Sequence, residues 1–262
     1  MERIFVFLRS PGAATSVLLG ATVLALILAN SPSSEQYFQI VNHHIGNLTI
    51  LEWVNDALMA IFFLFVGLEV KRELVSGELN TNAKRVMPGI AALFGVLTPA
   101  FIYYLIAGFH SEYIHGWAIP TATDIAFSIG IISALGSRVP NSMKVFLTAL
   151  AVIDDLIAII VIAIFYASSI HMMYLGAAVV VVAALIYCNK QGYVRPLPYI
   201  ILGFILWYCV LKSGLHATMA GVILAMTIPS KGKRGRKYVR PMQHWEHLLS
   251  NWVSFLIVPI FA

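Results

Sequence analysis

Charged residues are scarce in this sequence. Aspartate, glutamate, lysine and arginine together make up 11% of its 262 residues, whereas an ordinary soluble domain has about 25%. So few charges cannot cover the surface of a globular protein, which argues against a soluble enzyme and against a nucleic-acid-binding domain. The net charge of +5 would suit a nucleic-acid partner. The positions of the basic residues indicate membrane topology instead, so we expect no nucleic acid to bind.

Cysteine is also scarce. Cys188 and Cys209 both lie in apolar runs, so the sequence shows no disulfide framework. The first residues hold only a short apolar run, and no cleavage site of the Ala-x-Ala kind stands out, so we expect no removable signal peptide. Hydrophobic residues, in contrast, make up 60% of the chain, which points to a membrane protein.

Apolar stretches recur along the whole chain, and most have the roughly 17–25 residues that a helix needs to cross a bilayer. The seventh is short, but Lys212-Ser213-Gly214 offers a turn that separates it from the eighth. The pattern therefore predicts an all-α polytopic membrane protein. The expected spans are residues 12–30, 53–70, 86–109, 114–136, 145–169, 172–188, 197–211, 213–230 and 248–262.

The basic residues test this map. All 17 lie outside the cores of the spans, and with a cytoplasmic N-terminus every one except Lys212 falls on the cytoplasmic side. This distribution follows the positive-inside rule. Residues 229–247 are especially basic, and we expect them to anchor the topology in anionic headgroups, with a specific lipid or partner site as the alternative.

Two segments between or after the spans stand out. Residues 31–51 are polar, and Ile45, Leu48 and Ile50 alternate around Gly46-Asn47, which fits either a small hairpin or an irregular loop. The chain stops at Ala262 within an apolar run that has no polar flank. Because helices normally end in polar or capping residues, we expect the sequence to be cut within a membrane protein.

Four carboxylates fall inside the expected spans: Asp56, Asp124, Asp154 and Asp155. A carboxylate at the centre of a bilayer costs about 2.5–3.5 kcal/mol on insertion scales, so each is a candidate functional residue. Asp56 lies near the outer end of its span, where a solvated interfacial acid is at least as good an explanation.

Asp154 and Asp155 stand in the middle of the fifth span. Successive residues of a helix point about 100° apart, so both carboxylates can line one cavity. Two acids this close resist double ionisation, and at least one holds a proton unless a cation lies between them. A small hard cation such as Na+ prefers oxygen ligands, and its binding expels the proton. This competition predicts cation/proton exchange; a hydrogen-bonded pair that holds helices together is the alternative.

Asp124 follows Pro120, Thr121 and Thr123 in the fourth span. Proline donates no backbone hydrogen bond and disfavours helix just before it, while the threonine hydroxyls can satisfy freed backbone groups. The pattern alone fits an ordinary proline kink as well as a broken helix whose peptide dipoles face an ion site. The nearby acid favours the ion site.

Three weaker candidates have ionisable side chains and lie near the ends of the expected spans. Glu69 and Glu73 flank two basic residues, so local ion pairing is expected, although their placement also suits a proton-sensing surface. His216 begins the eighth span, where an imidazole can sense pH or simply pack at the interface.

Five stretches together resemble the NhaA family of bacterial sodium/proton antiporters, and the match runs from near the N-terminus to residue 262. The resemblance implies an inverted-repeat transporter fold with broken helices at the membrane midplane, an architecture for which this family is a standard example. It also implies one transmembrane transporter domain over residues 1–262. The stretches are Phe-Leu-Phe-Val-Gly-Leu-Glu-Val-Lys-Arg-Glu-Leu (63–74), Gly-Trp-Ala-Ile-Pro-Thr-Ala-Thr-Asp-Ile-Ala-Phe (116–127), Leu-Gly-Ser-Arg-Val-Pro (135–140), Ala-Val-Ile-Asp-Asp-Leu (151–156) and Leu-Lys-Ser-Gly-Leu-His-Ala-Thr (211–218).

The resemblance implies roles for the acids in the membrane. Asp155 is the expected main sodium and proton carboxylate, and Asp154 is its partner, alternating between ion binding and a charge pair. Asp124 and Thr123 are expected at the helix break, where Asp124 compensates opposing helix dipoles.

The same resemblance implies pH regulation and dimers. Members of the family are often dimers joined through an outside hairpin, which here is the segment around Ile45–Ile50. The positions that match residues tied to pH activation are Glu69, Glu73, His216 and Glu246.

The chain departs from the family at its end. The family has twelve helices, of which this chain supplies about nine, so the domain is expected to be incomplete at the C-terminus. A later lysine that pairs with the first aspartate is missing, as is the second broken helix that crosses the one around Asp124.

These inferences predict a multi-pass transporter of the bacterial inner membrane that exchanges Na+ or Li+ for protons by alternating access, with roles in pH homeostasis and salt tolerance. It would be no enzyme, need no cofactor, and contact only membrane lipids and a second copy besides its ions. One alternative is a transport-inactive truncated subunit. A less favoured alternative is an intramembrane aspartyl protease. Such proteases have a Gly-x-Gly-Asp motif and carry their two acids on separate helices, whereas here Asp124 follows Thr-Ala-Thr and the two closest acids adjoin each other.

Overall fold

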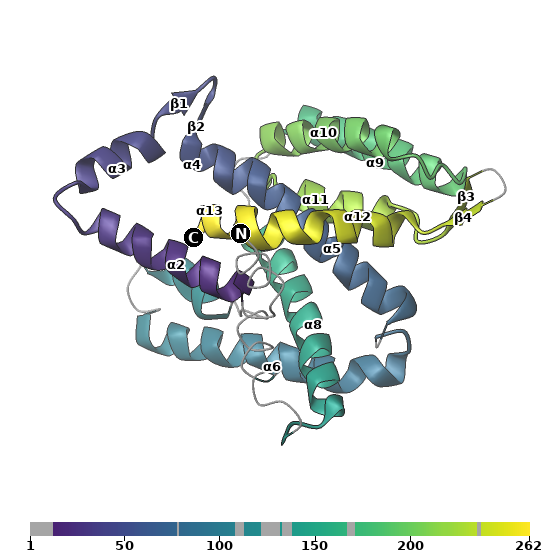
Figure 1. Ribbon diagram of the computed structural model, residues 1–262, viewed down its shortest axis with the longest axis horizontal. Helices are drawn as coiled ribbons and strands as arrows, with labels where there is room; N and C mark the ends of the chain where they lie inside the picture. Colours follow the sequence, from purple (N-terminus) through teal and green to yellow (C-terminus); the bar gives the residue numbers. More distant parts are fainter. Residues whose placement is uncertain are drawn as a thin grey trace, which may run out of the picture. The chain divides into compact units, whose positions relative to one another are not determined.

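The structure is a computed structural model, and it describes residues 13–77, 79–107, 113–121, 132, 138–166, 171–234 and 237–262. These described residues are 81% helical, which confirms the expected all-α class (Figure 1). In these ranges four helices are long and apolar enough to cross a membrane, or five if a bent helix pair counts as one span. The expected count of nine spans stays a prediction. The four are Ile50–Ser76, Asn82–Ala107, Met172–Lys190 and Pro196–Ser213.

The chain divides into two compact units. The first unit comprises Met1–Leu68 and Ser168–Ala262, and the second comprises Glu69–Ala167. One helix, α5 (Met59–Ser76), begins in the first unit and ends in the second.

The first unit opens with a bent helix pair and a hairpin. Helix α2 (Ala13–Ala29) meets α3 (Ser34–Val41) at 115°, and β1 (His44–Ile45) then pairs with β2 (Leu48–Thr49) in antiparallel register. Gly46 has φ +70°, which a two-residue hairpin turn requires. The structure thus has the small hairpin expected around Gly46-Asn47, whereas Ser34–Val41 of the same polar segment form helix α3.

The helix after the hairpin is continuous from Ile50 to Ser76. It starts with α4 (Ile50–Glu52), passes through a π-helical turn, η1 (Trp53–Leu58), and continues as α5. Thr49 and Glu52 form a capping box at its start: the Glu52 N–H donates to the Thr49 hydroxyl (3.2 Å), and the Thr49 N–H donates to the Glu52 carboxylate (2.7 Å). This reciprocal pair satisfies two N–H groups that a helix start leaves free.

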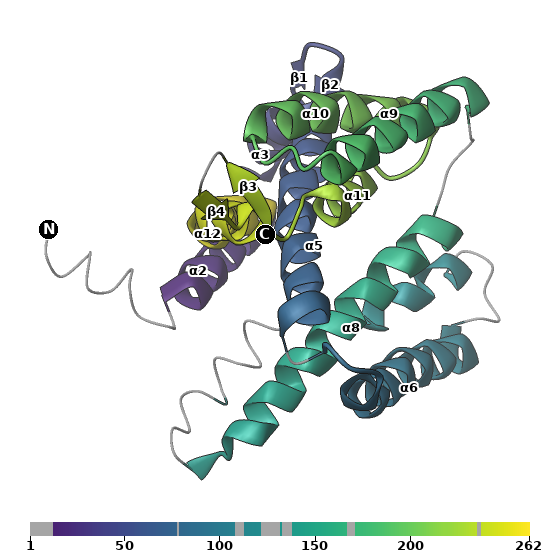
Figure 2. The same ribbon diagram turned by 90° about the vertical axis from the view of Figure 1, so that its right-hand side faces the viewer.

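Helices α9 (Met172–Lys190) and α10 (Pro196–Ser213) lie side by side (Figures 1 and 2). Gly214, with φ +84°, ends α10, so the expected break between the seventh and eighth spans is confirmed. The eighth is helical only over α11 (Met219–Thr227). Residues just before it form tight turns, and Ile228 is extended because a residue that precedes proline disfavours helix.

The first unit closes with a second hairpin and a helix. Strands β3 (Gly232–Arg234) and β4 (Lys237–Val239) pair in the basic segment. The final helix begins with α12 (Pro241–Trp252), earlier than the expected start at residue 248, because Pro241 suits a first helical turn. It continues through η4 (Val253–Ile257), which is π-helical, and α13 (Val258–Phe261).

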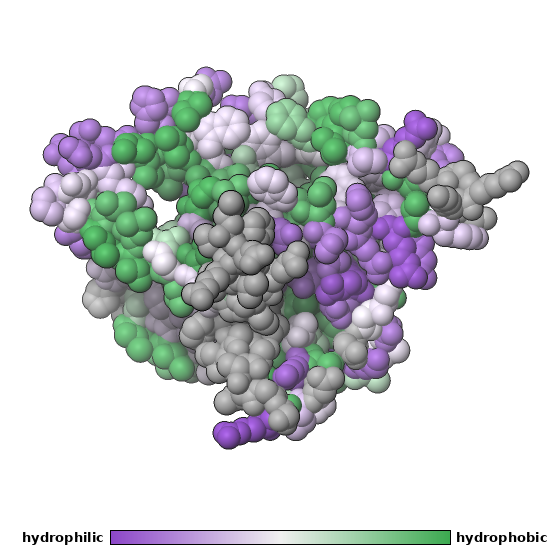
Figure 3. All heavy atoms as spheres, viewed as in Figure 1, coloured by the Kyte–Doolittle hydropathy of each residue, from purple (hydrophilic) through white to green (hydrophobic). Residues whose placement is uncertain are grey.

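The core of the first unit joins α5, α9, α10, α11 and α12. Its members include Leu68, Leu185, Leu206, Ala225 and Met242, each at most 2% exposed. Hydrophobic residues are also exposed in several patches on the face drawn in Figure 3, as lipid-facing helices require. Helix α2 alone exposes Leu19, Val23, Leu24, Leu26 and Ile27.

The second unit contains the end of α5, α6 (Asn82–Ala107), the 3-10 helix η2 (Ile114–Thr121) and α8 (Asn141–Phe165). Helix α6 packs against both α8 and η2. Of the expected fourth span, residues 114–136, the structure describes the 3-10 turn that contains Pro120, and Ile132. The predicted helix break around Asp124 lies outside the described residues.

Candidate functional site

The paired acids Asp154 and Asp155 lie on α8, in the middle of a 25-residue apolar helix. Asp154 is 4% exposed, and Asp155 is half-buried. Ala151 and Val152, one turn before Asp155, are 5% and 4% exposed. The helix thus holds one carboxylate in the protein interior and the next about 100° around its axis, so the two can serve one cation from adjacent directions.

Helix α6 lies beside the turn of α8 that carries these acids. A Cβ atom at Gly89 of α6 would lie 4.0 Å from Cδ1 of Ile153, the residue before Asp154. Pro88, Ala92 and Val96 are buried on one face of α6. Small and ring-closed side chains let the two helices approach closely, so α6 forms a wall next to the acid pair.

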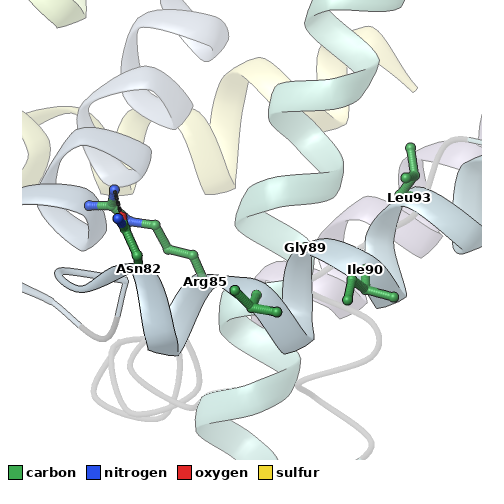
Figure 4. Close-up of a pocket in the computed structure, with 6 residues that line it drawn as sticks. Asn82, Arg85, Gly89, Ile90 and Leu93 are labelled. Atoms are coloured by element: carbon green, nitrogen blue, oxygen red, sulfur yellow. Dashed lines mark hydrogen bonds between the residues drawn. The ribbon is translucent and has the colours of Figure 1, made fainter.

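A groove of about 400 Å³ runs along α6 and includes Gly89 in its lining. In Figure 4 the Arg85 side chain extends toward Asn82, to which it donates a hydrogen bond of 3.4 Å, and Ile90 and Leu93 follow further along the helix. The six residues that line the groove include no carboxylate, so the groove offers a cation no charged oxygen ligand.

The acids at the end of α5 share one arginine. Arg72 Nη2 lies 3.0 Å from Oε1 of Glu73 and 3.6 Å from Oε1 of Glu69, and Arg72 Nε donates to Glu73 at 3.1 Å. The Glu73 side chain is 13% exposed, and that of Glu69 is 33% exposed. The structure therefore shows the local ion pairing expected from the sequence, with Arg72 as its centre.

The other two candidates for pH regulation lie in the first unit. His216 is half-buried in the turn between α10 and α11. Glu246 lies on α12 and is 9% exposed. The structure thus places Asp154, Asp155, Glu69 and Glu73 in one unit and His216 and Glu246 in the other, while Thr123 and Asp124 lie outside the described residues.

Sequence reasoning missed the contacts of Asp56. Its backbone carbonyl, inside the π-helical turn η1, accepts a hydrogen bond of 2.8 Å from Nε1 of Trp207 on α10. The Trp207 ring stacks on that of Trp53, with centroids 6.1 Å apart. The only signal in the sequence was an acid within an apolar stretch.

The part of the chain described by the structure contains no group of three His, Cys, Asp or Glu side chains placed to hold a metal ion. Within the described ranges, the acid pair on α8 places two neighbouring carboxylates in an apolar helix. Asp154 and Asp155 contribute two carboxylates from the single helix α8. A bound ion that takes more oxygen ligands receives them from other residues or from water.

A family described as Na+/H+ antiporter 1 matches residues 6–262. Proteins named Na(+)/H(+) antiporter NhaA are similar over 98% of this chain: one from Mesorhizobium japonicum is 54% identical, one from Brucella ovis 49% and one from Rhizobium etli 48%. The matches cover 65%, 66% and 66% of those relatives, so the chain spans about two thirds of their length. On this evidence the chain belongs to the Na+/H+ antiporter 1 family.

Proposed function

We propose that this protein is a secondary transporter that exchanges sodium ions for protons across a membrane. The observation that carries the proposal is the pair Asp154 and Asp155 in the apolar helix α8, with Asp154 only 4% exposed. Membership of the antiporter family supports the same function.

The chemistry of the pair supplies a mechanism. Two neighbouring carboxylates in a poorly solvated site repel each other, so a proton or a cation must reduce their charge. When Na+ binds, it displaces the proton, and when the proton returns, it weakens the Na+ site. If the site opens to one side of the membrane at a time, each conformational change carries one kind of ion, and the proton gradient drives sodium out.

We assign the roles as follows. Asp155 is the main ion-binding carboxylate, and Asp154 is its partner. Thr123 and Asp124 lie at a helix break in the fourth span, where Asp124 balances the peptide dipoles that meet there. Li+, a second small hard cation, uses the same site.

Four acids and imidazoles regulate transport in this proposal. Glu69 and Glu73 act through Arg72 at the end of α5, whereas His216 and Glu246 act from the first unit. Regulation acts through the attraction between these groups and their charged neighbours, as in the ion pairs of Arg72 with Glu69 and Glu73.

The same proposal includes topology and assembly. In this proposal the protein lies in the inner membrane of a bacterial cell with its N-terminus and the β3–β4 hairpin in the cytoplasm, an orientation that the distribution of basic residues supports. Residues 1–262 belong to a single transporter domain. A second copy pairs with it through the β1–β2 hairpin, whose strands are only two residues long each.

Everted membrane vesicles test the function. The protein, produced from its whole reading frame in cells that lack their own sodium/proton antiporters, is expected to release protons from acidified vesicles when NaCl is added, but not when choline chloride is added. No sodium-dependent proton movement across the range pH 6.5–8.5 would contradict the proposal. Peptide cleavage by the purified protein would favour the intramembrane protease instead.

A further inference from the structure

The 3-10 helix η2 is attached to α6 through one tyrosine. The Tyr103 hydroxyl on α6 donates a hydrogen bond of 2.7 Å to the backbone carbonyl of Tyr113, the residue directly before η2. The Gly116 N–H donates to the same carbonyl at 2.9 Å. The Tyr113 carbonyl therefore accepts both the bond that closes the first turn of η2 and a bond from a neighbouring helix.

Gly116 gives the Tyr103 side chain room to reach that carbonyl. A Cβ atom at position 116 would lie 3.0 Å from Cζ of Tyr103 and would clash with its hydroxyl oxygen. A side chain at this position would therefore push the tyrosine away from η2. The hydrogen bond and the close approach together hold η2 at one fixed distance from α6.

A second contact joins η2 to the helix that carries the acid pair. The Trp117 ring of η2 meets the Phe165 ring edge to face, with centroids 5.2 Å apart and an interplanar angle of 90°. Phe165 is the last residue of α8, and this arrangement is one that aromatic rings prefer. Two side chains from different helices, Tyr103 and Phe165, thus hold η2.

Helix α6 connects η2 with the acid pair. Gly89 lies beside Ile153, the residue before Asp154, whereas Tyr103 lies about 21 Å further along the same helix. Because α6 is helical throughout Asn82–Ala107, the position of η2 relative to the acids is set by this helix.

The end of η2 is buried. Thr121, its last residue, is 6% exposed, and its hydroxyl donates to the Ala118 carbonyl at 2.7 Å. Thr123 and Asp124 follow closely in the sequence, and the proposed function assigns them to the helix break. The position of η2 then decides where the chain enters that break.

We propose that Tyr103 is a positioning residue for sodium binding, whose hydroxyl holds η2 on α6 and thereby sets the position of the helix break relative to the acid pair on α8. This inference rests on the proposed function. Tyr103 acts through η2 and does not itself bind the ion. Without its hydroxyl, the peptide dipoles and oxygen atoms at the break no longer meet the carboxylates at the distance that the cation needs.

Hydrogen exchange tests the attachment without any transport measurement. Tyr103→Phe keeps the ring and removes the hydroxyl. In the purified protein in detergent, the amides of residues 113–121 are expected to exchange about threefold to tenfold faster in this variant. Tyr104→Phe, at a 54% exposed tyrosine of the same helix, is the matched control and should exchange like the wild type. Unchanged exchange in Tyr103→Phe would overturn the attachment.

Transport in everted vesicles tests the positioning role. Tyr103→Phe is expected to raise the sodium concentration for half-maximal proton release about threefold to tenfold, while the maximal rate stays within about twofold. The acid pair is intact in this variant, so exchange proceeds once sodium is bound. Tyr104→Phe should keep the wild-type value. A lower maximal rate with unchanged half-saturation would make Tyr103 a structural residue and overturn the proposal.

A second substitution acts on the same contact from the other side. Gly116→Ala is expected to raise the half-saturating sodium concentration at least as much as Tyr103→Phe does, and the double variant no more than Gly116→Ala alone. Gly95→Ala on α6, where no atom lies within 4 Å of the added carbon, is the control. Effects that multiply in the double variant would show that the two residues act separately and overturn the shared contact.

The outcomes separate this inference from the proposed function. Faster exchange in Tyr103→Phe with an unchanged sodium dependence would overturn the positioning role and leave sodium/proton exchange standing. A wild-type protein that moves no protons on sodium addition would overturn the proposed function, and with it the role in sodium binding. Hydrogen exchange would then still decide whether Tyr103 holds η2.

Discussion

Arg85 at the start of α6 donates a hydrogen bond to the backbone carbonyl of Leu74 in the last turn of α5, 3.3 Å away, and another to the carbonyl of Leu79. The last carbonyls of a helix have no partner within it, and a cation is favourable at that end of the helix dipole. One side chain thus closes the connection between two helices of the second unit.

Arg85→Gln is expected to lower the free energy of unfolding by about 1–3 kcal/mol, because it removes hydrogen bonds from a charged donor. The measurement is thermal or denaturant unfolding in detergent. Arg195→Gln, at an exposed arginine before α10, removes the same charge and is expected to change stability by less than about 0.5 kcal/mol. Equal effects of the two substitutions would contradict this account of Arg85.

Gly221→Ala is expected to destabilise the protein by about 1–3 kcal/mol, because the added methyl group meets the Ala60 carbonyl and forces α5 and α11 apart. Gly176→Ala in α9 is the matched control, since no atom lies within 4 Å of the added carbon. That substitution should be neutral or stabilise by up to about 1 kcal/mol. If both alanine variants unfold at the wild-type temperature, the close contact is wrong.

Local chemistry made parts of the fold predictable. Gly46 supplies the positive φ that a two-residue hairpin needs, and Gly214 supplies the left-handed residue that ends α10. Both features depend on a few neighbouring residues, so the sequence carries their signal directly. The shortening of α11 at Ile228 also has a local cause, the proline that follows, although the apolar run around it indicated a longer helix.

Tertiary contacts made other parts unpredictable. The π-helical turn η1 is held by Trp207, which lies 151 residues from Asp56 in the sequence. The hydropathy pattern shows Asp56 only as an acid within an apolar stretch. It does not reveal which residues of α5 and α11 lie opposite each other. The close approach of these helices depends on which small residues face each other, and a single sequence does not reveal that pairing.

The candidate site also has features that the sequence predicts and features that only the structure provides. The cost of placing a carboxylate in a bilayer identifies Asp154 and Asp155 as candidate functional residues, and the structure adds that the first is buried on α8. The ion pair of Arg72 with Glu69 follows from their spacing of three residues on one helix, whereas the shorter contact with the adjacent Glu73 does not follow from helical spacing. The roles of Thr123 and Asp124 stay predictions.

Asp124→Ala is expected to slow sodium-driven proton movement less than Asp155→Asn does, because its proposed role is to balance helix dipoles without binding the ion. Asp124→Asn keeps a polar side chain and serves as the comparison. Initial rates in everted vesicles at several sodium concentrations measure the effect. Complete loss of transport in Asp124→Ala, at normal protein levels, would place this acid among the ion ligands instead.

Asp154→Asn is expected to reduce the rate of exchange by about tenfold or more, which corresponds to about 1.4 kcal/mol. The amide still offers an oxygen to the cation but removes one of the two charges whose competition couples sodium to protons. Proton release on sodium addition, measured against external pH, gives the rate. Full activity would show that one carboxylate is enough.

The acid pair on α8 is proposed to exchange a proton for a sodium ion, and Asp155→Asn removes the carboxylate assigned as the main ion ligand. Thr148→Val is the control on the same helix, because the Thr148 hydroxyl donates a hydrogen bond to the carbonyl of Lys144 within that helix, 3.0 Å away. Sodium-driven proton movement in everted vesicles is measured for both variants at equal protein levels. We expect no exchange by Asp155→Asn and near-normal exchange by Thr148→Val; near-normal exchange by Asp155→Asn would show that the acid pair is not the exchange site.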